Sequence, residues 1–267
     1  MMNIRIASST DKGRLRKVNE DRHLVISSIE YVNSFNDRVK QPAGQSAALV
    51  AVADGMGGFK AGELAASLAI QAIEEQLHGI RLSTEASGKE ITDFLDSIFL
   101  QAKSLILDYV KQEPDFSEMG TTLVTGFLHQ DNLYISWLGD SRCYLYRKED
   151  GLQCLTRDHS YVQMMLTAGV ITAEEAFAHP FSNMIMQCLN GDPNKRAFPD
   201  HAVIAVESGD RFLFCSDGLN SMIKDAELET ILQHQKDIDT CIKCCVDTAN
   251  EHGGRDNITV IILDIES

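Results

Sequence analysis

Acidic residues recur where an apolar stretch of this sequence meets a glycine-rich turn. LVAVADGMGG, residues 49–58, ends an apolar run at Asp54, and Gly55 follows at once. RFLFCSDG, residues 211–218, ends in the same way at Asp217. The other acids at such junctions are Asp140 after ISWLG, Asp256 within GGRDN, and Glu20 and Asp21 within RKVNED. Asp and Gly are ordinary turn residues, so one such pair alone would indicate only a turn.

The recurrence of these acids predicts a site for hard divalent cations. Strand ends of one sheet can converge in space, and converging carboxylates repel one another unless a cation neutralises them. Ligands that are all oxygen atoms suit Mg²⁺ or Mn²⁺ better than zinc. A glycine beside the acid lets the backbone carbonyl approach the same ion. We therefore expect Asp54 to bind metal, with the small Gly55 leaving room for ion and substrate.

The elements that must position these acids come as hairpins separated by helices. Apolar or alternating runs predict strands, whereas apolar residues at three- and four-residue steps predict helices. Strands are expected at 4–8, 23–29, 47–53, 122–128, 133–137, 143–147, 152–156, 202–206, 211–216 and 258–265, and helices from 59 onward and at about 91–112, 224–234 and 238–251. Thr172 and Glu175 match a capping box within an irregular helical stretch. This order favours the α+β class over alternating βαβ units.

Composition and length fit one soluble globular domain. The chain has 267 residues, 44% of them hydrophobic and 24% charged, which is ordinary for this class. A net charge of −15 argues against a general nucleic-acid binder. We find no stretch long enough to cross a bilayer and no signal peptide, so no membrane association is expected. Seven cysteines, an odd number, suggest reduced thiols and a cytoplasmic location.

Eight segments, in order along nearly the whole chain, resemble the metal-dependent protein phosphatases of the PP2C type in their bacterial form. They are DKGRLRKVNED (11–21), VADGMGG (52–58), MGTTLV (119–124), LGDSRCYLYR (138–147), LTRDHS (155–160), HPFSNMIMQCLNG (179–191), FCSDGL (214–219) and RDNITVIIL (255–263). Each is weak alone, but their order and spacing make the resemblance specific. It implies a four-layer α-β-β-α sandwich, two antiparallel sheets flanked by helices, as a single domain over 1–267. Residues from about 158 to 190 would form a flap beside the active site.

The resemblance also implies a role for each acid. Asp54 would lie between two Mn²⁺ or Mg²⁺ ions, and the Gly55 carbonyl would bind one of them. Asp217 and Asp256 would bind the other ion.

Further positions follow from the same resemblance. Glu20 and Asp21 would hold metal-bound water, and Asp140 matches the acid that binds a third, weaker metal. Arg16 matches the arginine that grips the substrate phosphate. At the position where eukaryotic members carry a histidine this chain has Met56, which cannot donate a proton to the leaving group.

These roles together imply hydrolysis of phosphoserine and phosphothreonine on proteins by a metal-activated water, without a covalent phosphoenzyme. The expected enzyme is a monomer that opposes a bacterial serine/threonine kinase and acts on phosphorylated protein substrates. A cysteine phosphatase is excluded because no cysteine lies six residues before an arginine. The P-loop signature GxxxxGK(S/T) of nucleotide-binding proteins and the HRD and DFG signatures of kinases are also absent.

Two other functions stay open. The chain could be an enzyme dedicated to one phosphorylated regulator, or a pseudo-enzyme that binds phosphoproteins, although its intact acids disfavour the latter.

A few further residues have an ordinary and a functional interpretation. The cysteines of CIKCC (241–245) fit core positions of a helix better than a zinc site, because no second CxxC accompanies them. Thr121 and Thr122 are expected to pack and hydrogen-bond behind the metal site. His159 fits a structural role better than that of a substitute proton donor.

Overall fold

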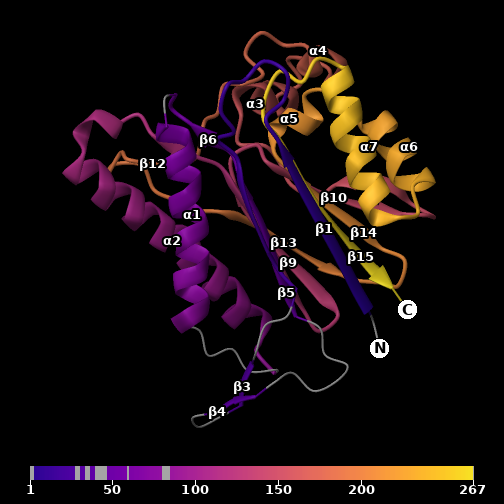
Figure 1. Ribbon diagram of the computed structural model, residues 1–267, viewed down its shortest axis with the longest axis horizontal. Coiled ribbons are helices and arrows are strands. Elements are labelled where there is room, and N and C mark those ends of the chain that lie inside the picture. Colours follow the sequence, from indigo (N-terminus) through magenta and orange to yellow (C-terminus); the bar gives the residue numbers. More distant parts are fainter. Residues whose placement is uncertain are drawn as a thin grey trace.

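Two antiparallel five-stranded sheets form the centre of the computed structural model, which describes residues 3–27, 31–33, 37–39, 47–58, 60–79 and 85–266 (Figure 1). The first sheet has the order β1 (Asn3–Asp11), β15 (Ile258–Glu266), β14 (Arg211–Cys215), β10 (Arg142–Arg147) and β11 (Gly151–Cys154). The second has the order β13 (Asp200–Ala205), β9 (Asn132–Leu138), β8 (Leu123–His129), β5 (Ala48–Ala53) and β2 (Arg22–Ile26). The two sheets face each other and leave their outer faces to the helices.

Helices cover both outer faces, as Figure 1 shows. The second sheet packs against α1 (Ala61–Gly79) and α2 (Gly88–Gln112), and the first against α5 (Asp217–Asn220), α6 (Asp225–His234) and α7 (Ile238–Glu251). Smaller elements are β3 (Tyr31–Asn33), β4 (Asp37–Val39), β6 (Gly55–Met56), β7 (Gly120–Thr121), β12 (Leu189–Asn190), η1 (Pro114–Phe116), α3 (Tyr161–Thr167) and α4 (Ala173–Phe177). The predicted four-layer α-β-β-α sandwich is confirmed.

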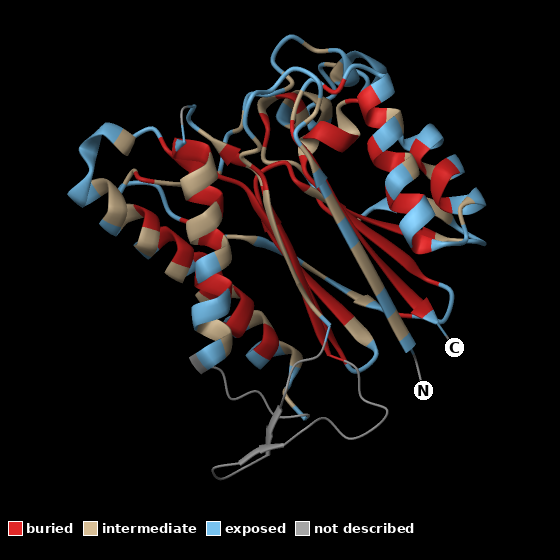
Figure 2. Ribbon diagram, viewed as in Figure 1, coloured by how far each residue is buried: buried red, intermediate tan, exposed pale blue. Residues whose placement is uncertain are grey.

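Three apolar cores hold the four layers together, and Figure 2 shows the buried residues on the facing surfaces. The sequence of β5 is apolar without alternation because both faces of this strand are covered. Leu49 packs toward α1 and α2, whereas the next residue, Val50, packs into the core between the sheets. In that inner core Phe214 lies directly over Gly126, where a Cβ atom would stand 2.3 Å from the ring. The sheets can therefore approach closely at this point because one side is a glycine.

The predicted ends of most strands and helices agree with the structure to within one or two residues, and the exceptions have physical reasons. Strand β1 runs from residue 3 to 11 because it pairs along its whole length with β15, although its polar residues weaken the sequence signal. The strands predicted at 202–206 and 211–216 exist but belong to different sheets. Helix α2 begins three residues early, at a capping box formed by Ser87 and Glu90. Helix α5 was missed, since four residues are too few to show a period.

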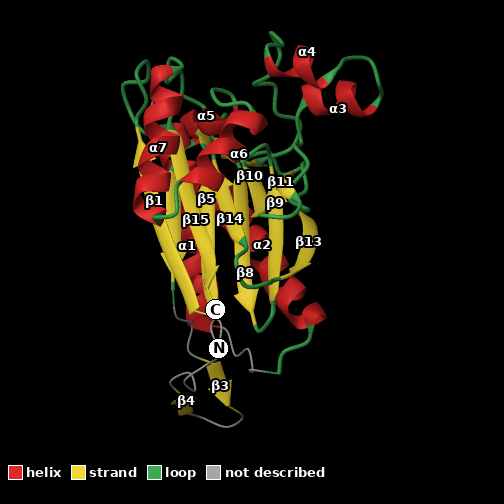
Figure 3. Ribbon diagram, turned by 90° about the vertical axis from the view of Figure 1, so that its right-hand side faces the viewer, coloured by secondary structure: helices red, strands yellow, loops and turns green. Residues whose placement is uncertain are grey.

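The region from 158 to 190, called the flap below, connects β11 to β12 and carries α3 and α4. Figure 3 shows both helices beyond one end of the sandwich. The predicted capping box at Thr172 and Glu175 starts α4. In the segment 30–46, expected to be an extended hairpin loop, β3 and β4 do pair, and the rest lies outside the described residues. No helix in the described ranges combines the length and the hydropathy that a bilayer span requires.

Candidate active site

The acids singled out in the sequence come together at one end of the sandwich. Figure 1 shows this end by β6 and α5, which begin next to Asp54 and at Asp217 respectively. Asp54 and Asp140 follow strands of the second sheet, whereas Asp217 follows and Asp256 precedes strands of the first. The acids therefore converge from both sheets. The sequence pattern alone suggested instead that the strand ends of one sheet would converge.

Mutual repulsion and burial mark these carboxylates as one cluster. Burial, followed by repulsion from Asp21, Asp217, Asp140 and Asp256, raises the pKa of Asp54 well above its usual value. Burial, then repulsion from Asp256 and Asp21, raises the pKa of Asp217 to about 7. Burial and repulsion from Asp217 likewise raise the pKa of Asp140. Such an arrangement is costly for the protein alone and is eased by a bound cation.

Unsatisfied oxygen atoms point to the same conclusion. The Oδ1 atoms of Asp21, Asp140 and Asp217 are buried and accept no hydrogen bond from the protein. Asp21 and Asp140 are only 2% and 4% exposed, so water cannot easily compensate. A buried acceptor without a donor destabilises a fold by about 1–3 kcal/mol, and more when it is charged. These oxygen atoms fit the ligand chemistry of Mn²⁺ or Mg²⁺.

The cluster is not yet a finished ligand set. Within the described part of the chain, no group of three or more His, Cys, Asp or Glu side chains is arranged so that it could hold a metal ion as it stands. The observation that supports a metal site is therefore the chemistry and burial of the donors.

Arg16 lies at the edge of this cluster and contacts one of the predicted metal ligands. Its Nη2 atom donates to Asp256 Oδ2 at 2.6 Å, and its side chain is 49% exposed. The loop that carries Arg16 is bound to the loop before β15, since the Arg14 amide donates to the Gly254 carbonyl at 2.7 Å. Gly13 has φ of +77°, and a Cβ atom there would lie 2.1 Å from the Asp256 carbonyl oxygen. Close backbone packing thus places a guanidinium beside the acids.

Asn257 is a site residue that the sequence interpretation did not assign a role. Its Oδ1 accepts the Glu20 amide at 2.8 Å, and its Nδ2 donates to the carbonyls of Lys12 and Val18. Its position directly after Asp256 was the available signal. Glu20 itself is partly buried, and its charged neighbours are Arg16, Asp256 and Glu63. Glu20 therefore lies at the margin of the cluster, nearer to Arg16 than to its centre.

The glycines beside the acids allow neighbouring backbone segments to pack against each other without a side chain between them. A Cβ atom on Gly55 would lie 2.2 Å from the Gly62 carbonyl oxygen in α1 and 2.7 Å from that of Glu20. A Cβ atom on Gly218 would lie 1.9 Å from the Asn257 carbonyl oxygen. The space beside Gly55 is thus filled by backbone, which corrects the expectation that it leaves room for ion and substrate.

Buried hydroxyl groups orient Asp21, and no pattern in the sequence indicated them. Asp21 Oδ2 accepts hydrogen bonds from Ser216 Oγ and Thr259 Oγ1, both at 2.7 Å. Thr259 Oγ1 is also 2.8 Å from Thr10 Oγ1. Because both donors lie on the same carboxylate oxygen, they hold Asp21 with its other oxygen free.

Thr121 and Thr122 lie behind Asp54, in the role expected for them. Thr121 Oγ1 donates to the Asp54 carbonyl at 2.9 Å, and Thr122 Oγ1 accepts the Asp54 amide at 3.0 Å. Thr122 Oγ1 also lies 2.7 Å from Ser141 Oγ, in the turn after Asp140. The hydroxyl groups therefore connect the turns that carry two of the acids.

Replacement of Thr259 by Val should weaken Mn²⁺ binding by about 10-fold, the lower end of the usual effect of groups that orient a metal ligand. The change keeps the side-chain shape but removes a donor to Asp21. Calorimetric titration with Mn²⁺ measures the effect. The control is Thr230→Val, because Thr230 is exposed on α6 and its Oγ1 donates to the Ala226 carbonyl of the same helix. Equal affinity in Thr259→Val and wild type would show that the hydroxyl does not orient a ligand.

His159 has a structural environment. Its Nδ1 accepts the Gly139 amide at 3.1 Å, and its ring stacks on Trp137. The proton of a neutral ring is therefore on Nε2, which lies 3.4 Å from Asp200. Cys241 and Cys245 are buried in the apolar core under α7, in agreement with the structural interpretation of CIKCC.

Comparison with known proteins places the whole chain among protein phosphatases. A family model described as Protein phosphatase 2C matches residues 33–253. The serine/threonine phosphatase stp of Listeria innocua is 34% identical over 255 residues, which are 96% of this chain and 93% of that protein.

Solved structures agree with this family match. The crystal structure of the Mycobacterium tuberculosis serine/threonine phosphatase PstP/Ppp superposes with a TM-score of 0.81 at 32% identity, covering 99% of each chain. A second structure, the catalytic domain of PstP in complex with two manganese ions, gives a TM-score of 0.79 at 31% identity and covers 100% of both chains.

Proposed function

This chain belongs to the protein phosphatase 2C family and is a serine/threonine phosphatase, and on that premise we propose that its acid cluster holds two divalent metal ions, Mn²⁺ or Mg²⁺. The observation that carries the proposal is the convergence of buried carboxylates from both sheets, three of them with an unsatisfied oxygen. The two manganese ions named for the PstP structure support the choice of metal.

We assign the ligands from the positions of the acids. Asp54 is repelled by four other acids, and it would help to hold both ions together with the Gly55 carbonyl. Asp217 and Asp256 are placed on the second ion, and Asp140 on a third and weaker one. Asp21 and Glu20 are placed around the ligand waters. Bound ions of this kind would supply a water molecule with a lowered pKa, which is a suitable nucleophile for phosphate ester hydrolysis.

Arg16 is assigned to the phosphate of the substrate. Its guanidinium is half-exposed and lies beside Asp256, so it can turn toward a ligand at the mouth of the cluster. A guanidinium donates two parallel hydrogen bonds to phosphate oxygens and stays charged. Met56 follows Gly55 and has no proton to give, so the leaving oxygen takes its proton from another group.

The substrates are phosphorylated proteins, and we place the enzyme opposite a serine/threonine kinase, as a monomer. The second candidate is an enzyme dedicated to one regulator. PppA, which superposes with a TM-score of 0.77 at 30% identity, is described as a key regulatory component of a secretion system in Pseudomonas aeruginosa. The intact acids disfavour a phosphoprotein-binding pseudo-enzyme.

Hydrolysis of p-nitrophenyl phosphate, measured with Mn²⁺ and after its removal by a chelator, tests the proposal. We expect activity that requires Mn²⁺ and returns when Mn²⁺ is restored. Phosphothreonine and phosphotyrosine versions of one peptide then serve as matched substrates, and only the former should be hydrolysed efficiently. Activity that is indifferent to the chelator would contradict the metal assignment.

A further inference from the structure

A cavity of about 530 Å³ lies between the flap and the end of the sandwich. Its lining includes Asp140 and Asp217, so the cavity is continuous with the acid cluster. The remainder is formed by the end of the β10–β11 hairpin, the region of α5, and the two flap helices α3 and α4. The size is within the range of about 300–1,000 Å³ that is usual for small-ligand sites.

Apolar residues form much of the wall that the two flap helices contribute, beside the polar Gln163 and the charged Glu174 of the same helices. The apolar residues of α3 and α4 in this wall are Val162, Leu166, Ala173, Ala176 and Phe177. Such a wall stabilises an apolar group that leaves water, by roughly 25 cal/mol for each Å² of apolar surface. The cavity therefore offers one apolar side to whatever enters it.

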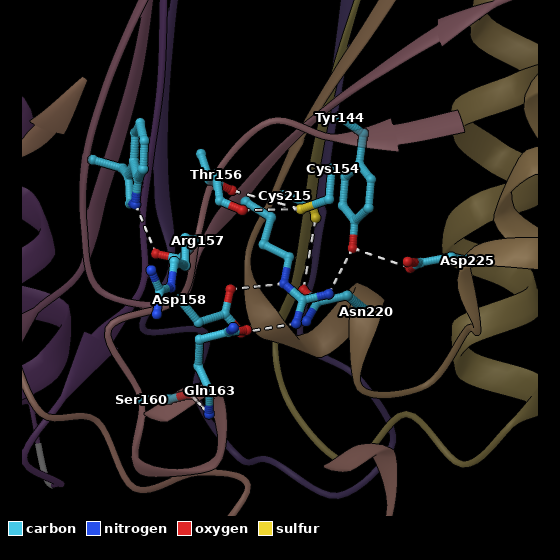
Figure 4. Close-up of polar contacts among 12 residues, drawn as sticks. Tyr144, Cys154, Thr156, Arg157, Asp158, Ser160, Gln163, Cys215, Asn220 and Asp225 are labelled. Carbon is cyan, nitrogen blue, oxygen red and sulfur yellow. Dashed lines mark hydrogen bonds and ion pairs between the residues drawn. The ribbon is translucent and has the colours of Figure 1, made fainter. Parts of the chain in front are cut away.

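Two of the charged residues that line the cavity, Arg142 and Asp158, are paired with each other. Arg142 forms two hydrogen bonds with the carboxylate of Asp158, both at 2.8 Å, and donates a third to Tyr144 Oη at 2.8 Å. Tyr144 Oη in turn donates to Asp225 Oδ1 at 3.3 Å, as the dashed lines of Figure 4 show. A charged ligand would gain little from groups that satisfy one another. This pairing and the apolar residues of the flap helices together favour an uncharged ligand.

The flap is held in place on this cavity by its two ends. The His159 amide donates to the Gly139 carbonyl at 2.8 Å, and the Met186 amide donates to the His159 carbonyl at 2.7 Å. The Tyr161 amide also donates to the Met184 carbonyl at 2.9 Å. The start and the end of the flap are thus joined to each other and to the turn before Asp140, which anchors the base of the flap beside the acids.

We propose that this cavity is a subsite for an apolar side chain of the phosphoprotein substrate, a few residues from the phosphorylated serine or threonine. The proposal rests on the function proposed above. An extended peptide advances about 3.3 Å per residue, so residues close to the phosphorylated one reach a cavity that begins at the acid cluster. Leu, Ile, Met or Phe is the expected occupant.

Phosphothreonine peptides that differ at one flanking position at a time measure the preference. We expect a Leu or Phe at one position to raise kcat/KM by roughly 10- to 100-fold over Ser, mainly through KM, which is the range that full burial of such a side chain allows. Lys or Glu at that position should give no such gain. An absence of any positional preference in the wild type, or a preference for a charged residue there, would overturn the proposal.

Ala176→Trp tests the cavity itself, because Ala176 faces it from α4. The added ring should reduce the preference for the apolar peptide to about 3-fold or less, while p-nitrophenyl phosphate and the Ser peptide are hydrolysed as by the wild type. The matched control is Ala178→Trp, since Ala178 is exposed just after α4 and does not line the cavity.

A second variant keeps the test decisive if Ala176→Trp folds poorly. Leu166→Asn makes the wall polar with little change in size and should reduce the same preference. Unchanged preference in a folded variant would assign the selection to another surface. A wild type that fails to hydrolyse p-nitrophenyl phosphate with Mn²⁺ would instead remove the proposed function, so the two failures are distinguishable.

Discussion

Replacement of Asp54 by Asn should reduce Mn²⁺-dependent hydrolysis by more than about 100-fold, because groups that only orient a metal ligand already contribute about 10- to 100-fold. Asp54 is repelled by acids from both halves of the sandwich, and a neutral amide there would remove the anionic ligand that we propose the two ions share. The activity is measured with p-nitrophenyl phosphate over a range of Mn²⁺ concentrations that saturates the wild type.

The same substitution should stabilise the protein without metal. The amide removes one charge from a cluster of repelling carboxylates while keeping the size of the side chain. A gain of about 1 kcal/mol would raise the unfolding temperature by about 2–4 °C in a chain of this size. In contrast, Mn²⁺ should stabilise the wild type more than the variant.

The control is Asp150→Asn, in the exposed turn after β10, which should change neither activity nor stability. Loss of activity together with loss of stability in the metal-free Asp54→Asn variant would mean that Asp54 is a structural residue. Retained Mn²⁺-dependent activity would remove it from the metal site.

Replacement of Arg16 by Ala should lower kcat/KM for a phosphopeptide by about 100-fold. The guanidinium offers two charge-assisted hydrogen bonds to phosphate, each of which contributes about 1.5–3 kcal/mol. Arg16→Lys keeps the charge but loses the parallel pair of donors, so a smaller loss of about 10-fold is expected. Steady-state kinetics at saturating Mn²⁺ measure both variants.

The affinity of the Arg16 variants for Mn²⁺ distinguishes a role of Arg16 in binding the substrate phosphate from a role in supporting the metal site. Arg16 forms its ion pair with Asp256, so its removal leaves that carboxylate free. Binding of Mn²⁺ to Arg16→Ala should therefore be as tight as to the wild type or tighter. Weaker binding would place Arg16 in the support of the metal centre. Lys17→Ala, at the exposed neighbouring cation, should behave as the wild type.

The acids of the site were predictable because each occupies a recognisable turn beside an apolar strand. The helix boundaries were nearly as accessible, and the Ser87–Glu90 capping box was visible in the sequence as Ser-x-x-Glu. Such signals are local: they depend on residues a few positions apart.

The groups that orient the acids were not predictable in the same way. Thr10, Thr259 and Ser216 meet near Asp21 from β1, from β15 and from the position just after β14, and their contact depends on the pairing of these three strands. A threonine on a strand has no sequence mark that separates it from other strand threonines. The contact of Gly55 with Gly62 was hidden for the same reason, because it depends on how closely α1 lies to β6.

The contact of Phe214 with Gly126 links the active centre to the spacing of the two halves of the sandwich. One half provides Asp54 and Asp140, and the other provides Asp217 and Asp256, so any sliding of one half over the other alters the distances among the four acids. A displacement of about 1 Å in a catalytic arrangement can cost about 100-fold in rate. With the four acids in the roles proposed for them, the rate of this enzyme therefore depends on how the two sheets pack against each other.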